Sequence, residues 1–322
     1  MRDPAALPPE QSRFLAGTPY AGWTVEPMPG DADVRRYWRL AAPDDSAILM
    51  DMTAAAPAAF EAFCAIGAHL RTHGLAAPAV RHAVKGTAML VLEDFGTTTL
   101  ARAAAEAPDR EATLYRAATE AMLAVQGAPP PPGLGVLTPE VGGGMLAPLF
   151  EWYCPRAPGA ETLESAMADA LERHAGPAER LSLRDYFSEN LMWREDRAGT
   201  GRIGLLDFQD AFVAPAAYDL ASLLRDARRD VAPEAVEAAM GLFVETTGTD
   251  RAAADRAVAV LSVQRNLRIL GIFARLARRD GKTRYLPMLP RVRAHVLADV
   301  AHPALAALRR PVEAALSARP FV

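Results

Sequence analysis

Hydrophobic residues recur with two different periods in the first 95 residues of the chain. A 3.6-residue spacing that begins at Pro57 places Phe60, Phe63 and Leu70 on one face and predicts a helix that ends at Gly74. A shorter helix is expected to begin at Pro8-Pro9 and to close at Gly17. Short extended runs predict five strands, at 24–28, 36–41, 47–52, 79–83 and 88–92. This order predicts a small antiparallel sheet with one long helix, its last two strands forming a hairpin.

The pattern changes after residue 95, where long helical segments rich in Ala, Leu and Arg dominate. Two breaks interrupt them, at 127–144 and around 182–207. The first has four consecutive prolines and three consecutive glycines, which predict a surface loop, stiff at first and then flexible. The second holds two apolar runs that predict another hairpin. We therefore expect an α+β architecture with a sheet-rich lobe at 1–95 and a mainly helical lobe at 96–322.

Composition favours a folded protein in the cytoplasm. The chain has 322 residues, of which 51% are hydrophobic and 23% charged, so it can bury a sizeable core. No apolar run reaches the roughly 18 residues of a transmembrane helix, and the first residues lack a signal-peptide pattern. Two cysteines are too few for a disulfide framework. We expect no membrane partner, and a monomer or a weak dimer.

The basic residues are unusual in kind and in placement. Lys85 and Lys282 are the only lysines, so 33 of the 35 basic residues are arginines. Residues 251–293 carry eleven basic and two acidic residues, a net charge of +9, which leaves −13 for the rest of the chain. This asymmetry indicates either an anionic partner near the C-terminal region or a solvated helix face.

Three polar residues around the second break have the chemistry of phosphoryl transfer. Asp185 and Asn190 lie five residues apart ahead of the predicted hairpin, and Asp207 ends an apolar run 22 residues after Asp185. Phosphoryl transfer from ATP needs a carboxylate beside the attacking hydroxyl and oxygen ligands for Mg²⁺. Asp185 suits the first role, and Asn190 and Asp207 suit the second. The hairpin should bring Asp207 back beside Asn190. Each residue alone could simply cap a turn.

Together with their neighbours, these residues resemble the aminoglycoside phosphotransferase and choline kinase family, which has a protein-kinase-like fold. The resemblance rests on RDxxxxN, an apolar strand ending in DFQD, and YDLASLL. Five stretches resemble the bacterial branch that phosphorylates the anomeric hydroxyl of N-acetylmuramate and N-acetylglucosamine in cell-wall recycling. They are GDADVRRYWRL, LEDFG, LFEWY, LRDYFSENLMW with LLDFQDAF, and GIFARLARRDGKTRYL.

The resemblance implies a role for most of these positions. It implies an ATP- and Mg²⁺-dependent kinase in which Asp185 is the catalytic base and Asn190 and Asp207 hold the metal. Asp219 would brace the catalytic loop, while Asp210 would lie near the substrate or behind the metal ligands. The nucleotide phosphates would contact a covering loop formed by Asp31, Ala32, Asp33 and Val34. Adenine would be held by a hinge formed by Glu93, Asp94 and Phe95.

Two positions depart from the family pattern. Met50 stands on the third strand where most of these kinases have a lysine that contacts the ATP phosphates, and Leu183 replaces a histidine before the Arg-Asp pair. Because neither lysine is near, an arginine must neutralise the phosphates if the enzyme is active. Candidates are Arg35, Arg36 and Arg39, with Arg36 and Arg39 preferred, since arginine can hold phosphate oxygens through two bonds.

The basic C-terminal segment favours a neutral or anionic small-molecule acceptor over a polycationic aminoglycoside or choline. Arg275, Arg279 and Arg284 are the residues expected to approach it. The losses at 50 and 183 leave a nucleotide-binding pseudokinase or regulator as the alternative. Nucleic acid is not expected as a partner, because no aromatic-interleaved basic stripe accompanies the charge.

Overall fold

The N-terminal part of the chain forms one antiparallel sheet. The computed structural model describes residues 7–28, 35–155 and 159–317. The strands pair in the order β1-β2-β3-β5-β4, and every neighbouring pair is antiparallel. They are β1 (Thr24–Pro27), β2 (Arg36–Ala41), β3 (Ser46–Asp51), β4 (Val80–Ala83) and β5 (Met89–Glu93). Each begins and ends within two residues of its predicted range.

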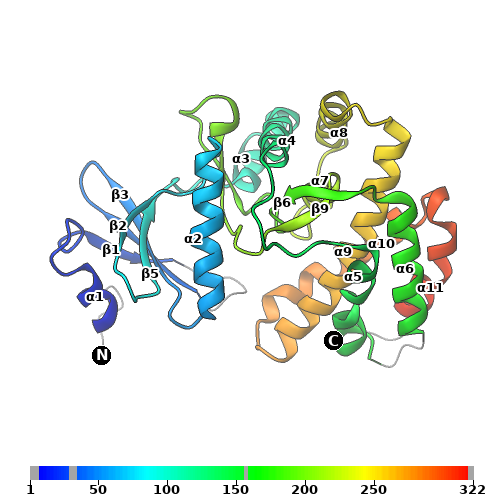
Figure 1. Cartoon of the computed structure of the whole chain (residues 1–322), viewed down its shortest axis with the longest axis horizontal. Coiled ribbons are helices and arrows are strands. Elements are labelled where there is room, and N and C mark those ends of the chain that lie inside the picture. The colour runs from blue at the N-terminus through cyan, green and yellow to red at the C-terminus, as the bar shows by residue number, and fades with distance from the viewer. Residues whose placement is uncertain (1–6, 29–34, 156–158, 318–322) are drawn as a thin grey trace.

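A helix covers each face of this sheet. Trp38, Leu40 and Leu49 pack with Phe14 and Leu15 of α1 (Pro9–Leu15), while the residues that alternate with them point to the other face. On the opposite face, β3 and β5 contribute to a second apolar cluster together with α2 (Pro57–Thr72). That cluster runs on into the C-terminal part of the chain, so α2 lies between the sheet and the rest of the molecule (Figure 1).

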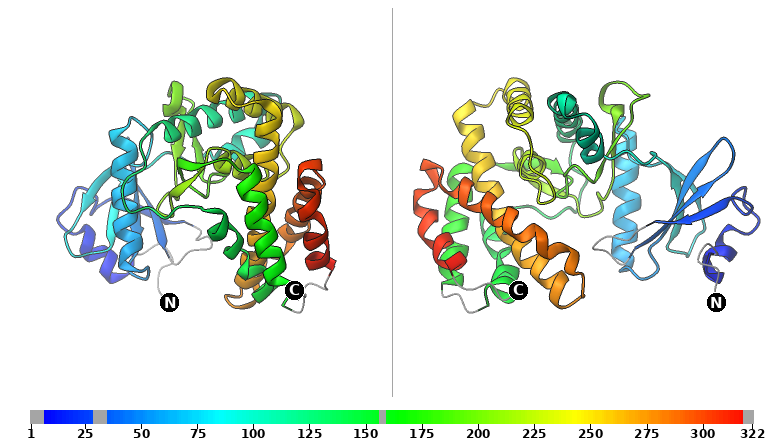
Figure 2. Two further views of the ribbon diagram at one scale, coloured as in Figure 1. Left: turned by 45° about the vertical axis from the view of Figure 1, so that its right-hand side comes forward. Right: turned by 180° about the vertical axis from the view of Figure 1, so that it is seen from behind.

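The remainder is mainly helical (Figure 2). Its α-helices are α3 (Leu100–Glu106), α4 (Glu111–Gly127), α5 (Pro139–Gly144), α6 (Ala160–His174), α7 (Tyr218–Leu224), α8 (Pro233–Thr247), α9 (Arg251–Arg278), α10 (Leu289–Val300) and α11 (Ala306–Ser317). A π-helical turn, η2 (Leu149–Tyr153), and a 3₁₀ segment, η4 (Thr283–Met288), pack against α9. The last sheet residue, Glu93, and the first following helical residue, Leu100, lie on either side of the boundary predicted at residue 95.

Two small antiparallel sheets lie among these helices. β7 (Leu191–Trp193) pairs with β8 (Ile203–Leu205) as the predicted hairpin. β6 (Ala178–Ser182) pairs with β9 (Phe212–Pro215). The second pair was not predicted, because β6 carries charged residues and its partner lies some thirty residues further along the chain.

The glycine-rich end of the first break is ordered, contrary to the prediction of a flexible loop. Residues 139–144 form α5, capped by the Thr138 hydroxyl, and Gly142 and Gly143 are buried. A Cβ atom on Gly143 would lie 2.5 Å from the Glu164 carbonyl oxygen of α6. The glycines therefore serve close helix packing.

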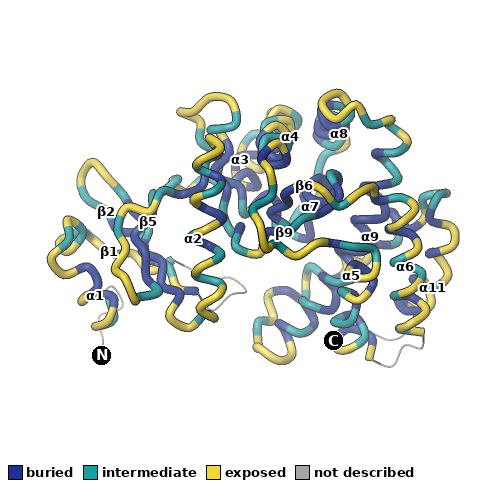
Figure 3. Tube along the Cα trace, viewed as in Figure 1, coloured by how far each residue is buried: buried dark blue, intermediate teal, exposed yellow. Residues whose placement is uncertain are grey.

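Helix α9 forms the centre of the helical lobe. By length and composition it could cross a membrane, yet 83% of its most apolar 18-residue window is buried inside the protein. Figure 3 shows α9 buried along most of its length, enclosed by its neighbours. It contacts α6, α7, α10 and both short helical segments, which is the behaviour of a core helix.

Candidate active site

The loop that carries Asp185 is held by a buried carboxylate. Asp219, in the first turn of α7, accepts hydrogen bonds from the Ser182 hydroxyl at 2.7 Å and from the backbone N–H groups of Leu183 and Arg184 at 2.8 and 3.0 Å. Burial raises the pKa of Asp219 to about 6, although these hydrogen bonds and the Arg265 cation act to lower it. The structure thus gives Asp219 the bracing position that the sequence analysis expected.

The bracing fixes an uncommon backbone. Arg184 has a φ of 68°, in the left-handed region of backbone conformation that residues other than glycine rarely adopt. This residue immediately precedes Asp185, whose carboxylate is about one third exposed. Such conformations persist where the surroundings over-determine them, and they cluster at functional sites.

The hairpin returns Asp207 to the same loop, as predicted. Leu206 donates its N–H to the Asn190 carbonyl at 3.0 Å. Asn190 Nδ2 lies 2.9 Å from the Asp185 carbonyl oxygen and 3.4 Å from Asp207 Oδ2. Asp207 also has a left-handed φ, of 57°. Asp185, Asn190 and Asp207 therefore form one cluster, although they come from two separate segments.

This cluster fits a divalent cation that takes its other ligands from phosphate or water. Asn190 uses its Nδ2 for both of its bonds, so its Oδ1 is not needed for either one. Among the described residues no group of three or more His, Cys, Asp or Glu side chains could hold a metal. Mg²⁺ in nucleotide sites is typically held by only one or two protein carboxylates together with substrate phosphates. Asp207 and Asn190 match that donor set.

Arg35, just before β2, is the small-lobe arginine that reaches this cluster. It forms an ion pair with Asp207, donates to Gln209 Oε1 at 2.8 Å, and is buried. The two preferred candidates point elsewhere: Arg36 pairs with the buried Asp51, and Arg39 holds Asp94 at 2.7 Å. The geometry therefore favours Arg35 over Arg36 and Arg39 as the arginine near the phosphates, because Arg36 and Arg39 pair with carboxylates of the small lobe itself.

The position of the missing lysine lies in an apolar, buried environment that does not accommodate a charged side chain. Met50 is fully buried in the apolar cluster beneath α2. Lys85 is exposed at the turn between β4 and β5, and Lys282 follows α9. Leu183, at the position of the missing histidine, is also buried in the apolar core. Both departures from the family pattern thus lie in buried, apolar surroundings.

The predicted hinge is braced from both lobes. The Asp94 carboxylate accepts from Arg39 and from the Gly96 N–H at 2.8 Å. Arg194 of the helical lobe pairs with Glu93 at 3.3 Å, and its guanidinium carbon lies 4.3 Å from the centre of the Phe95 ring. The phosphate-covering residues Asp31, Ala32, Asp33 and Val34 lie outside the described residues.

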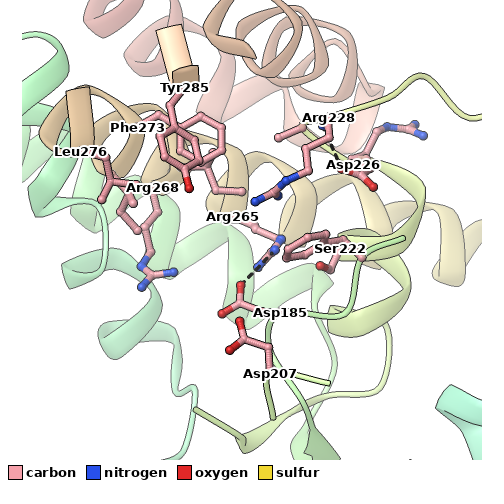
Figure 4. Close-up of a pocket in the computed structure, with 15 residues that line it drawn as sticks. Asp185, Asp207, Ser222, Asp226, Arg228, Arg265, Arg268, Phe273, Leu276 and Tyr285 are labelled. Carbon is pink, nitrogen blue, oxygen red and sulfur yellow. Dashed lines mark hydrogen bonds and ion pairs between the residues drawn. The ribbon is translucent and has the colours of Figure 1, made fainter. Parts of the chain in front are cut away.

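A pocket of about 170 Å³ opens beside Asp185 and Asp207 (Figure 4). Asp226 and Ser222 of the α7 region line it, as do apolar side chains from α9 and η4. Four arginines also contribute to the lining: Arg225, Arg228, Arg265 and Arg268.

The arginines predicted to approach an acceptor are not the ones that line this pocket. Arg279 pairs with Asp280 at 2.7 Å on the exposed end of the helix, and Arg284 is exposed beside the Tyr285 ring. Arg275 is half-buried and does not line the pocket either. Within the same basic segment, the helical phase places Arg265 and Arg268 in the pocket lining instead. Asp210 is exposed and accepts from Gln209 at 3.2 Å, outside the pocket lining.

Arg265 is a site residue that the sequence analysis missed. Its guanidinium donates to the Arg184 carbonyl at 2.8 Å and lies 3.4 Å from Asp185 Oδ1. A signal for it was present, since residues 265, 268, 272 and 276 fall on one face of a helix, but only the fold shows that this face meets the loop.

Known proteins are similar to this chain in sequence and in fold. The profile of the Phosphotransferase enzyme family matches residues 24–255. A protein from Caulobacter vibrioides named N-acetylmuramate/N-acetylglucosamine kinase is 35% identical, over 93% of this chain and 94% of its own. A protein of the same name from Pseudomonas aeruginosa is 32% identical, over 82% of this chain and 80% of its own.

A solved structure is similar to this chain in fold. A choline/ethanolamine kinase family protein from Mesorhizobium loti superposes with a TM-score of 0.66 at 18% identity, over 94% of this chain and 98% of that one. The predicted fold, a protein-kinase-like arrangement of a sheet-rich and a helical lobe, is confirmed. With the family profile covering more than two thirds of its length, this chain belongs to the phosphotransferase enzyme family.

Proposed function

We propose that this enzyme transfers the γ-phosphate of ATP to the anomeric hydroxyl of an N-acetylated amino sugar, N-acetylmuramate or N-acetylglucosamine. The observation that carries the proposal is the Asp185–Asn190–Asp207 cluster beside a pocket, in a chain 35% identical to a kinase named for both sugars. Intact carboxylates in this cluster argue against a pseudokinase.

In this proposal Asp185 accepts the proton of the acceptor hydroxyl. The hydroxyl oxygen forms a bond to the γ-phosphorus as the bond from that phosphorus to the β–γ bridging oxygen breaks, which yields ADP and a sugar 1-phosphate. Arg265, held by the Arg184 carbonyl, keeps the Asp185 carboxylate in place. A positioned base of this kind contributes roughly 10²- to 10⁴-fold to the rate.

Asn190 and Asp207 would hold Mg²⁺, which when bound neutralises charge on the phosphate oxygens. Arg35 would exchange Asp207 for a phosphate oxygen, supplying from the small lobe the positive charge that lysine gives elsewhere. Glu93, Asp94 and Phe95 would hold adenine through their backbone groups. We place the enzyme among soluble cytoplasmic kinases.

The pocket lining also bears on the acceptor. Polycationic aminoglycosides need carboxylate-rich clefts, whereas four arginines line this pocket with three aspartates. Asp185 and Asp207 are two of those aspartates and are committed to the reaction itself. The lining therefore supports a neutral or anionic acceptor over an aminoglycoside or choline.

Phosphorus NMR of the products formed from ATP and N-acetylmuramate tests this function. We expect an anomeric phosphate; a phosphate on another hydroxyl would keep the family and reject the anomeric reaction. Higher turnover with a polycationic aminoglycoside would reject the sugar assignment, and ATP binding without turnover on any acceptor would favour a regulator.

Asp185→Asn tests the catalytic base. We expect turnover to fall at least 10²-fold. Glu189→Gln is the matched control, because Glu189 lies in the same loop with its side chain exposed and outside the pocket lining. Undiminished turnover in Asp185→Asn would overturn the assignment.

A further inference from the structure

One guanidinium in the pocket has no protein partner in the described part of the chain. Three of the four lining arginines are engaged: Arg225 pairs with Asp299 at 2.9 Å, Arg228 lies over the Phe187 ring, and Arg265 binds the Asp185 loop. Arg268 makes neither a hydrogen bond nor an ion pair to any described residue. A half-buried cation without a partner is costly unless a ligand supplies the opposite charge.

The surroundings of Arg268 are cationic. Burial is the main cause that lowers the pKa of Arg268, and the charges of Arg184 and Arg265 lower it further, against the opposing effect of Tyr218 and Asp185. Arg184 adds to this cluster, since its Nε is buried without a hydrogen-bond partner. The carboxylate that acts on Arg268, Asp185, already pairs with Arg265. The local field therefore favours an incoming anion.

The position of Arg268 relative to Asp185 sets where that anion would lie. Arg268 follows Arg265 by three residues on α9, so their side chains leave neighbouring turns about 5–6 Å apart. Arg265 contacts Asp185, and Figure 4 shows Arg268 reaching from the same helix beside that pair. A group bound by Arg268 would thus lie in the same pocket as the reacting hydroxyl.

The rest of the pocket wall is apolar. Ile272, Phe273 and Leu276 of α9, together with Tyr285 of η4, line it. Such a wall accommodates the faces of a sugar ring and an acetyl methyl group, and it strengthens a nearby ion pair by excluding water.

We propose that Arg268 binds a carboxylate carried by the acceptor, and that it thereby sets the preference of this enzyme for N-acetylmuramate over N-acetylglucosamine. The two sugars differ in charge, because only N-acetylmuramate carries a carboxylate, on its lactyl ether. The inference rests on the proposed function, of which it specifies the acceptor.

The test compares both sugars as acceptors for the wild type and for Arg268→Gln, at saturating ATP and Mg²⁺. We expect KM for N-acetylmuramate to rise about tenfold to a hundredfold, the loss typical of a charge-assisted hydrogen bond. For N-acetylglucosamine, KM should change less than about threefold, and kcat should be retained for both. Arg268→Lys, which keeps the charge, should restore most of the preference.

Arg256→Gln is the matched control, since Arg256 lies on the same helix but outside the pocket lining. Equal losses on both sugars, or no change on either, would overturn the role of Arg268 while leaving the proposed function intact. A wild type that phosphorylates neither sugar would reject the proposed function itself.

Equilibrium binding gives a readout that does not depend on turnover. In the Asp185→Asn background, N-acetylmuramate should bind more tightly than N-acetylglucosamine, and adding Arg268→Gln should remove that difference. Equal binding of the two sugars before Arg268 is replaced would refute the inference, as would binding of neither.

Discussion

At the scale of single residues, Asp219 has the clearest structural consequence. Its buried carboxylate accepts the Ser182 hydroxyl and two consecutive backbone N–H groups, which hold Arg184 in its left-handed conformation. The cost of burying this charge is visible in its pKa, raised to about 6. Asp219 thus stabilises the loop, and it also makes the free energy of unfolding depend on pH.

We predict a pH dependence that Asp219→Asn removes. Because the folded-state pKa of Asp219, about 6, exceeds its ordinary value of 3.8, the folded protein holds the proton more tightly than the unfolded chain does. The resulting stabilisation is complete below pH 3.8 and is lost as the pH rises through 6. Between pH 4.5 and 7.5 the free energy of unfolding of the wild type should therefore fall by about 2 kcal/mol relative to the variant.

Urea unfolding of both proteins at the two pH values measures this difference. The variant serves as the internal reference, since all other titrating groups are common to both proteins. A constant difference between them across this range would contradict the assignment of a raised pKa to Asp219. In the variant we also expect slower turnover, because an Asn side chain can accept through only one atom.

Arg35 is the second residue-scale case. If its guanidinium moves from Asp207 to the nucleotide phosphates, Arg35→Ala should raise KM for ATP roughly tenfold or more, as loss of a charge-assisted contact does. Steady-state kinetics with varied ATP measures the effect. Arg81→Ala is the control. Arg81 is likewise a small-lobe arginine that pairs with an aspartate, Asp45, but it lies on strand β4 away from the site. A larger effect in Arg36→Ala than in Arg35→Ala would restore the preference drawn from the sequence.

At the scale of elements, the packing of α9 depends on a single missing side chain. A Cβ atom on Gly271 would lie 2.2 to 2.4 Å from backbone atoms of Pro148 and Leu149. Helix α9 therefore approaches η2 closely at this point, and the approach fixes the phase in which Arg265 and Arg268 face the loop.

We predict that Gly271→Ala lowers the free energy of unfolding by roughly 1–3 kcal/mol, because backbone atoms cannot move aside as a flexible side chain can. The control is Gly241→Ala in α8, where an added Cβ meets nothing within 4 Å. Alanine there should stabilise the helix by up to about 1 kcal/mol. Chemical denaturation measures both, and a loss in Gly271→Ala no larger than in the control would contradict the close-packing explanation.

At the scale of the whole molecule, the site is built from both lobes. Arg35 bridges from the small lobe to Asp207, and Arg194 bridges back from the helical lobe to Glu93. The main apolar cluster is continuous between the lobes, passing beneath α2. Ligands that bind between the lobes should therefore stabilise the protein as one unit.

We predict that ATP with Mg²⁺ raises Tm more than ATP with EDTA does, since ligand binding to the folded state stabilises it by mass action. In Asp207→Asn the additional increment from Mg²⁺ should be lost. Differential scanning fluorimetry at fixed ATP concentration measures both. Identical shifts with Mg²⁺ and with EDTA in the wild type would argue against a metal held by Asp207.

The sequence by itself determined the elements of the small sheet and the order of the chemistry along the chain. Periodicity located all five strands of the small sheet to within two residues, because alternating burial leaves a local pattern. The spacing of Asp185, Asn190 and Asp207 around one hairpin was sufficient to predict their proximity, since a short hairpin leaves little freedom. Composition likewise left only Lys85 and Lys282 as lysines, so an active enzyme was expected to use an arginine in place of the missing lysine.

Tertiary structure alone decided which arginines belong to the site. Arg35, Arg36 and Arg39 differ little in sequence context, yet Asp51 and Asp94 engage the latter two, which leaves Arg35 facing Asp207. Likewise, the contact of Gly271 with η2 sets the rotation of α9, which turns Arg265 and Arg268 toward Asp185 while Arg279 remains at the surface. A charge count shows that a cationic face exists; only long-range packing determines what that face meets.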